Sequence, residues 1–228
     1  MTIIHGDYIE KSRNALTELK NQYADREIRT LDGKTLNLEM VTQATESTSL
    51  FDKKILVVIE NALASLGRKT IKIREMIDNL KKCSQNTDIV CWEQKILGKD
   101  TVSLLGQDVR ICVFTYPKII FSLLDALKPN NTHILLTHLE NLILSESSDL
   151  VWNMMINRMR QLIQIQSGVV PAKMQMWQVS RLTNQARAFT MNELVKNYKK
   201  MLDMEYALKS GSSPFSISEM IKQWILEL

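Results

Sequence analysis

Residues 54–59 read KILVVI, a lysine followed by five apolar side chains, most of them β-branched. An unbroken run of this kind is typical of a strand that is covered on both faces, as in a parallel sheet. Shorter strand patterns occur at residues 2–5, 88–92 and 109–113. These patterns alternate with helical segments up to about residue 113. The sequence therefore predicts a small α/β domain with a mainly parallel sheet.

The character of the sequence changes after Tyr116-Pro117, because the pattern from there to the C-terminus is helical throughout. Two capping boxes, Thr190 to Glu193 and Ser216 to Glu219, mark the starts of the last two helices. The helix that begins after Thr190 is expected to bury one face, formed by Leu194, Tyr198, Met201 and Leu202. Five or six helices with short loops predict an α-helical bundle. The predicted domains are residues 1–115 and 116–228.

The composition is that of an ordinary soluble globular protein, with 45% apolar and 24% charged residues among 228. The sequence has no apolar run of about 18 residues, and it does not open with a secretory signal. Cys83, Cys91 and Cys112 form no Cys-x-x-Cys pair, which indicates reduced thiols. We therefore expect a cytoplasmic protein without a membrane span. The net charge of +4 is too small for a dedicated nucleic-acid binder.

Nucleotide hydrolysis needs a glycine-rich loop after the first strand, with a lysine at its end. The first strand here leads into HGDYI (residues 5–9), which has one glycine and no lysine. Glu60 and Glu93 end apolar strands, where an acid could hold magnesium. Without a phosphate loop, they are expected to be solvated carboxylates or helix-start acids. His133 and His138 are spaced by five residues, which does not suit a metal site on a helix. The sequence thus predicts a non-catalytic protein without a metal or cofactor.

A polar stretch at residues 45–52 contains the adjacent apolar pair Leu50 and Phe51. A regular element cannot easily bury both side chains on one face. Such a pair can anchor a partner's hydrophobic pocket, or it can tuck under the sheet at the start of the next strand. On spacing alone, the second interpretation is favoured.

Two segments resemble the delta subunit family of the bacterial DNA polymerase III clamp loader. Ser49-Leu50-Phe51, followed by the apolar strand ending in Glu60-Asn61, resembles the family's clamp-binding element. Residues 185–194 (QARAFTMNEL) and 207–211 (ALKSG) are similar to the helix–turn–helix signature of its collar domain. The signature positions are Gln185, Arg187, Phe189, Glu193, Leu194, Leu208, Lys209 and Gly211.

The resemblance implies an AAA+-like α/β domain without a P-loop, followed by a C-terminal helical collar that joins the loader's ATPase subunits. Leu50 and Phe51 would enter the hydrophobic pocket of the β sliding clamp, with Ser49 shaping the tip. The implied partners are that clamp, the tau/gamma ATPase subunits, delta-prime and, indirectly, primed DNA at the replisome. Family members are usually longer and carry a helical lid, for which residues 113–132 leave room for about one helix.

Three alternatives stay open from the sequence. One is an active AAA+ or P-loop hydrolase, and another is a delta-like AAA+ scaffold with a different partner. The third is a helical nucleic-acid-binding regulator. Its basic residues would be Arg158, Arg160, Lys173, Arg181 and Arg187.

Overall fold

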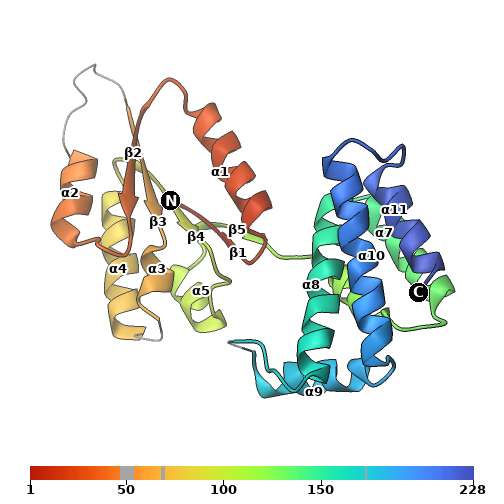
Figure 1. Ribbon diagram of the computed structural model, residues 1–228. Helices are drawn as coiled ribbons and strands as arrows, with labels where there is room; N and C mark the ends of the chain where they lie inside the picture. Colours follow the sequence, from red (N-terminus) through yellow and green to blue (C-terminus); the bar gives the residue numbers. More distant parts are fainter. Residues whose placement is uncertain (47–53, 68–69, 173) are drawn as a thin grey trace. The chain divides into compact units, whose positions relative to one another are not determined.

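The computed structural model describes residues 1–46, 54–67, 70–172 and 174–228. The chain divides into two compact units, Met1–Tyr116 and Pro117–Leu228 (Figure 1). The first unit is a parallel α/β structure and the second is helical. The predicted fold class, an α/β domain followed by a helical bundle, is confirmed.

The first unit is built on a five-stranded sheet in which every neighbouring pair is parallel. The strand order is β2-β3-β4-β1-β5. The strands are β1 (Thr2–Gly6), β2 (Glu27–Asp32), β3 (Ile55–Glu60), β4 (Asp88–Glu93) and β5 (Arg110–Phe114). Leu56, Val57, Val58 and Ile59 of β3 are completely buried, as expected for a strand covered on both faces.

The direction of each connection decides which face of the sheet its helix covers. From β1 the chain crosses to the far edge at β2, and it then returns strand by strand in the opposite direction. Because parallel crossovers are right-handed, the first helix and the later ones lie on opposite faces. Helix α1 (Ile9–Gln22) covers the face formed by Ile4, Leu56 and Trp92.

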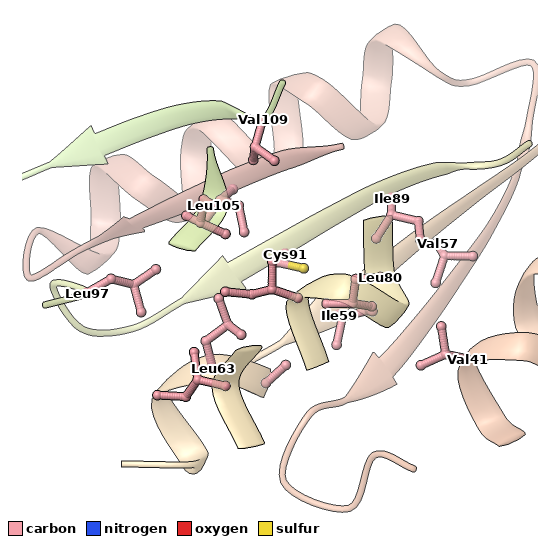
Figure 2. Close-up of a cluster of buried hydrophobic side chains, with 14 of the residues drawn as sticks. Val41, Val57, Ile59, Leu63, Leu80, Ile89, Cys91, Leu97, Leu105 and Val109 are labelled. Atoms are coloured by element: carbon pink, nitrogen blue, oxygen red, sulfur yellow. The ribbon is translucent and has the colours of Figure 1, made fainter. Parts of the chain in front are cut away.

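The other face carries the larger core. Helices α2 (Leu38–Glu46), α4 (Thr70–Cys83) and α5 (Lys99–Leu105), with the single turn α3 (Ala62–Ser65), supply side chains to it. Figure 2 shows this cluster, in which Val41 and Leu80 from helices meet Ile59 and Cys91 from strands. Alternate residues of β1, β3, β4 and β5 thus enter two separate cores.

Strand β2 was not predicted from the sequence, which showed only a turn signal at its end. The side chains of β2 alternate between partly buried and exposed, because β2 lies at the edge of the sheet. Its polar residues Glu27 and Arg29 break any apolar run. An edge strand with this pattern gives no strong signal in a single sequence.

The second unit contains six helices in the described residues, in agreement with the five or six predicted. They are α6 (Lys118–Ala126), α7 (Thr132–Ile143), α8 (Ser148–Gln166), α9 (Met176–Ala186), α10 (Met191–Lys209) and α11 (Ile217–Leu226). Both predicted capping boxes are present, at Thr190 and Ser216. Between β5 and α7 the chain forms α6 alone. No helix in the described part of the chain has both the length and the apolar character that crossing a membrane requires.

The core of the helical unit corrects one expectation about α10. Leu194 and Met201 are completely buried, and Met204 is nearly so, but Leu202 is 41% exposed. Consecutive helical residues point about 100° apart, and the buried face of α10 is formed by Leu194, Met201 and Met204, which leaves Leu202 outside it. The prediction that Leu202 belongs to the core is therefore wrong.

Met201→Ala should lower the free energy of unfolding by about 2–5 kcal/mol, because it removes a completely buried side chain. Leu202→Ala is the matched control, since it changes the adjacent residue of the same helix. It should cost at most about 1 kcal/mol. Urea denaturation of the two variants measures the difference, and equal losses would contradict this assignment of the buried face.

Candidate functional site

The predicted clamp-binding residues Ser49, Leu50 and Phe51 lie outside the described residues. The segments on either side of them are described. Thr87, next to the start of β4, donates its hydroxyl to the carbonyl of Thr45 in the last turn of α2, at 3.1 Å. Glu27, at the start of β2, donates its N–H to the carbonyl of Lys54 at 3.0 Å. Both flanks of the segment therefore lie where the parallel strands begin, which we call the amino edge of the sheet.

The opposite, carboxyl edge is where an α/β sheet usually binds its ligand. The connections leaving β1 and β4 go to opposite faces although the two strands are neighbours. Such a switch point normally opens a crevice at the carboxyl ends of the strands. Whether this chain has such a crevice for a ligand depends on the side-chain and backbone contacts at the carboxyl ends of its strands.

Close contact between strands accounts for the glycine at the end of β1. Gly6 has a φ of +148°, and a Cβ at this position would lie 1.7 Å from the carbonyl oxygen of Phe114. The next N–H groups do not form an open loop, because Tyr8 donates its N–H to the same carbonyl at 3.1 Å. Gly6 therefore allows β1 to approach β5, and the chain turns directly into α1 without a cradle.

The start of α1 presents an aromatic stack and negative charge. The ring of Tyr8 is buried and stacks on Tyr116, with 4.5 Å between ring centroids. Burial raises the pKa of Tyr116, and the carboxylates of Asp7 and Glu10 raise it further. A phosphate at a helix start needs N–H donors and positive charge. This helix start has one lysine, Lys11, whose Nζ atom lies 4.9 Å from the centre of the Tyr8 ring, and the two carboxylates of Asp7 and Glu10.

Glu60, at the end of β3, is held by an arginine from α1. Arg13 donates from both terminal nitrogens to the two carboxylate oxygens, at 2.6 and 2.8 Å. These bonds lower the pKa of Glu60. The guanidinium of Arg13 also lies 3.5 Å from the ring centre of Trp92, whose indole N–H donates to Ser12 at 3.2 Å. Both oxygens of the strand-end acid are therefore occupied within the protein.

Glu93, at the end of β4, is completely buried. Its two oxygens accept the backbone N–H groups of Leu63 and Ala64, at 2.8 and 2.9 Å. Burial raises the pKa of Glu93, and these hydrogen bonds act in the opposite direction. The sequence left two alternatives for Glu93, a solvated carboxylate or an acid at the start of a helix. The structure shows the second, because Glu93 binds N–H groups at the start of α3. Sequence reasoning did not indicate which helix, because α3 has only four residues.

The loop after β4 closes the crevice beside β1. Leu97 belongs to the same buried cluster as Cys91 and Leu63 (Figure 2). Its N–H donates to Nδ1 of His5, at 3.3 Å. His5 is 2% exposed, and its Nε2 atom has no hydrogen-bond partner among the described residues. Burial lowers the pKa of His5 below its ordinary value of 6.5. A side chain and a loop thus fill the position that a ligand would take.

The stability of the chain should fall as the pH is lowered from about 7 to 5, partly because of His5. Its pKa is lower in the folded state, so the unfolded chain binds a proton first as the pH falls. The stabilising contribution is complete above pH 6.5 and is lost progressively below it. His5→Asn keeps an acceptor for Leu97 but cannot titrate. Chemical denaturation across this pH range should show a smaller loss of unfolding free energy for the variant than for the parent. The same dependence of stability on pH in both proteins would contradict the assignment.

Metal ligation and thiol chemistry find no support in the described residues. No group of three or more His, Cys, Asp or Glu side chains in residues 1–46, 54–67, 70–172 and 174–228 could hold a metal ion. Cys91 is in the core, and burial raises the pKa of its thiol. A thiol in such surroundings is chemically inert.

The residues of the collar signature lie in α9, α10 and the turn between them. Gln185 joins three helices, because its amide nitrogen donates to the carbonyls of Leu124 and Leu127 at 2.7 and 2.9 Å. Its amide oxygen accepts from Arg158 of α8 at 2.8 Å. Carbonyls at a helix end otherwise lack partners. Gln185 therefore satisfies the end of α6 and ties it to α8 and α9.

Other signature residues cap or fill the same helix–turn–helix. Phe189 and Leu194 are buried, and Glu193 accepts the N–H of Thr190 in the capping box at 2.7 Å. Gly211 has a φ of +70° just after α10, where the chain closes with N–H bonds to the carbonyls of Leu208 and Ala207. Lys209 pairs with Glu205 at 2.5 Å, and Arg187 is exposed. Most of the signature therefore stabilises this fold, and Arg187 is the exception.

Gln185→Ala should cost about 1–3 kcal/mol of stability, because it leaves part-buried carbonyls of α6 and one N–H of Arg158 without their partner. Arg187→Ala, two residues along the same signature, should change stability by at most about 0.5 kcal/mol. Thermal or urea denaturation of the two variants provides the comparison. A neutral Gln185→Ala would show that this amide does not hold the end of α6.

Three of the basic residues of the nucleic-acid hypothesis bind groups of the protein itself. Arg158 and Arg181 both pair with Asp125, whereas Arg160 donates to the hydroxyl of Tyr198 on α10 at 3.1 Å. Arg187 is exposed on the turn after α9, and Lys173 lies outside the described residues.

A feature that sequence reasoning missed is a cavity of about 290 Å³ among α6, α8 and α9. It is lined by apolar side chains, three amides and the two arginines that pair with Asp125. Trp177 lines it and is 60% exposed. In a single sequence a tryptophan on a helix gives no sign of exposure, because its spacing also suits a core position.

Comparisons with known proteins find no matching family model and no matching curated protein. Several solved structures are similar to this chain, and two of them are described here. The Bacillus subtilis DNA clamp loader delta protein has a TM-score of 0.48 and 12% identity, over 99% of this chain and 94% of that chain. Domain III of the Thermotoga maritima replication initiation protein DnaA has a TM-score of 0.34 and 13% identity, over 99% and 84%. At these values the likeness carries no functional assignment, which has to come from the chain's own residues.

Proposed function

We propose that this chain is a non-catalytic delta subunit of a DNA polymerase III clamp loader, which binds and opens the β sliding clamp during DNA replication. The proposal rests on the resemblance of residues 49–61 and 185–211 to that family. The observation that carries it is the position of the flanks of the Leu50-Phe51 segment. They are fastened at the amino edge of the sheet, away from the internal contacts of Glu60 and Glu93 at the carboxyl edge.

The carboxyl edge supports a role without nucleotide hydrolysis. Magnesium bound to a nucleotide would need a free acid at a strand end. Arg13 occupies both oxygens of Glu60, and the N–H groups of α3 occupy those of Glu93. Residues 5–9, which lead from β1 into α1, contain no lysine, and the start of the helix carries Asp7 and Glu10 beside Lys11. In the proposed complex, the tau/gamma subunits therefore supply the energy of ATP.

In this proposal, the chain acts by binding its partners and catalyses no reaction. Leu50 and Phe51 would fill a hydrophobic pocket of the clamp, as an adjacent aliphatic and aromatic pair can. Ser49 would shape the tip. The α9–α10 hairpin and its neighbours would form the collar that joins the ATPase subunits and delta-prime. Because α6 is the one helix between β5 and α7, the proposal assigns no contact of the complex to a helical lid.

The test is isothermal titration calorimetry of the purified chain against the β clamp of the same organism. The parent should bind, and Leu50→Ala/Phe51→Ala should weaken binding by roughly thirtyfold or more, because two anchor side chains are lost. The variant should keep the parent's melting temperature. The parent should also fail to bind a fluorescent ATP analogue in the presence of magnesium.

Four results would count against the proposal. Unchanged affinity in the double variant would remove the assigned site, and a large fall in melting temperature would favour a pair tucked under the sheet. No binding by the parent would leave a delta-like scaffold with another partner. Tight binding of the ATP analogue would favour the hydrolase alternative.

A further inference from the structure

Two neighbouring cavities of the helical unit share the side chain of Arg181. The first, of about 290 Å³, lies among α6, α8 and α9, and the second, of about 410 Å³, lies between α6 and α9. Because Arg181 lines both, the two cavities adjoin each other. The first is close to the roughly 300 Å³ of the smallest ligand pockets. That volume suits one or two side chains of a partner.

The first cavity has apolar walls with exposed aromatic rings. Its apolar lining residues are Phe121, Leu124, Met154, Met174, Trp177 and Leu182. Phe121 is 39% exposed and Trp177 is 60% exposed. Aromatic side chains gain the most from burial when a partner covers them. The first cavity therefore suits an apolar side chain of another molecule.

The charged residues that line the two cavities do not balance. The cations are Lys128, Arg158 and Arg181, and Asp125 is the one acid among the described residues that line them. Arg158 and Arg181 both pair with the carboxylate of Asp125. One carboxylate cannot neutralise two guanidinium groups, and Lys128 adds a further positive charge. The surface therefore attracts anionic groups.

Arg158 also keeps unused hydrogen-bond donors. Its side chain is 12% exposed, and its hydrogen bonds to Asp125 and Gln185 both start from Nη1. In the described part of the chain, its Nε and Nη2 atoms donate to no acceptor. Burial lowers the pKa of Arg158 and Asp125 opposes this effect, but an arginine stays charged at neutral pH. A carboxylate would bind such a group through charge-assisted hydrogen bonds.

We propose that this surface binds a peptide segment of another protein, in which acidic residues stand beside one aromatic or large aliphatic side chain. The apolar side chain enters the first cavity against Phe121 and Trp177. The carboxylates bind the cations Lys128, Arg158 and Arg181. The positive charge of the surface selects an acidic segment over a neutral or basic one. This inference concerns the helical unit and does not rest on the sliding clamp as a partner.

Single-stranded nucleic acid is another occupant that aromatic rings and cations can bind. A groove for nucleic acid needs positive charge along a run of several phosphates. Here the two arginines gather around the single carboxylate of Asp125, and Lys128 lines the same cavity as that carboxylate. This arrangement favours a short acidic peptide, and nucleic acid is tested as the competing outcome.

The test is fluorescence anisotropy of the full chain with short labelled peptides built on a glycine–serine frame. The first peptide carries aspartates on both sides of a phenylalanine. The second has lysines in place of the aspartates, and the third has alanine in place of the phenylalanine. The first should bind with a Kd on the order of 100 μM or below, more weakly as salt is added. The other two should each bind at least about tenfold more weakly.

Variants of the chain locate the site. Trp177→Ala should weaken binding of the first peptide about tenfold. Met176→Ala should leave it unchanged, because Met176 is the adjacent residue, is 83% exposed and lines neither cavity. Arg181→Gln should weaken binding about threefold, since one of three cations is lost. Lys199→Gln removes a positive charge from an exposed position of α10 and should have no effect.

Equal binding of the aspartate and lysine peptides would overturn the proposal, because charge would then play no part. Equal losses in Trp177→Ala and Met176→Ala, or no binding of the first peptide by the parent, would overturn it as well. Melting temperatures identify a variant that does not fold, and the three peptides on the parent still decide the outcome. If oligothymidylate binds and Trp177→Ala abolishes this, while the acidic peptide does not bind, the surface belongs to nucleic acid instead.

Discussion

A parallel sheet requires every strand to begin at the same edge, so each connection must cross a whole face of the sheet. In this chain that requirement separates two edges with different surroundings. All five strands end at the carboxyl edge, where α1, α3 and the loop after β4 meet. All five begin at the amino edge, where the chain passes from α2 to β3. The separation follows from strand order and handedness, and any ligand or partner of this unit has to be assigned to one edge or the other.

The carboxyl edge is occupied by the protein's own side chains. Arg13 takes the place of a cation beside Glu60, and the buried carboxylate of Glu93 fastens α3. In each case a carboxylate at the end of a strand binds a group of the protein itself. Glu60 of β3 binds a side chain of α1, and Glu93 of β4 binds the backbone of α3.

The sequence predicted the features that depend on local pattern. The buried strand β3 follows from its unbroken apolar run, and the starts of α10 and α11 follow from their capping boxes. Features that depend on distant partners were not predicted. The edge strand β2 is polar and shows no apolar run. The exposure of Leu202 depends on which neighbour α10 packs against. The role of Glu93 depends on α3, a helix of four residues. The hydrogen bond from Arg29 to the carbonyl of Ala44 in α2 joins residues that are 15 apart in the sequence, and no local pattern reveals it.

The most direct test of the central claim is hydrogen–deuterium exchange of this chain with and without the sliding clamp that the proposed function assigns to it. The account predicts slower exchange in peptides that cover the end of α2 and the start of β3, at residues 43–56. It predicts no change at the carboxyl edge, in residues 6–9 and 94–98. Protection at the carboxyl edge instead, or no protection at the amino edge under conditions in which the clamp binds, would contradict the account.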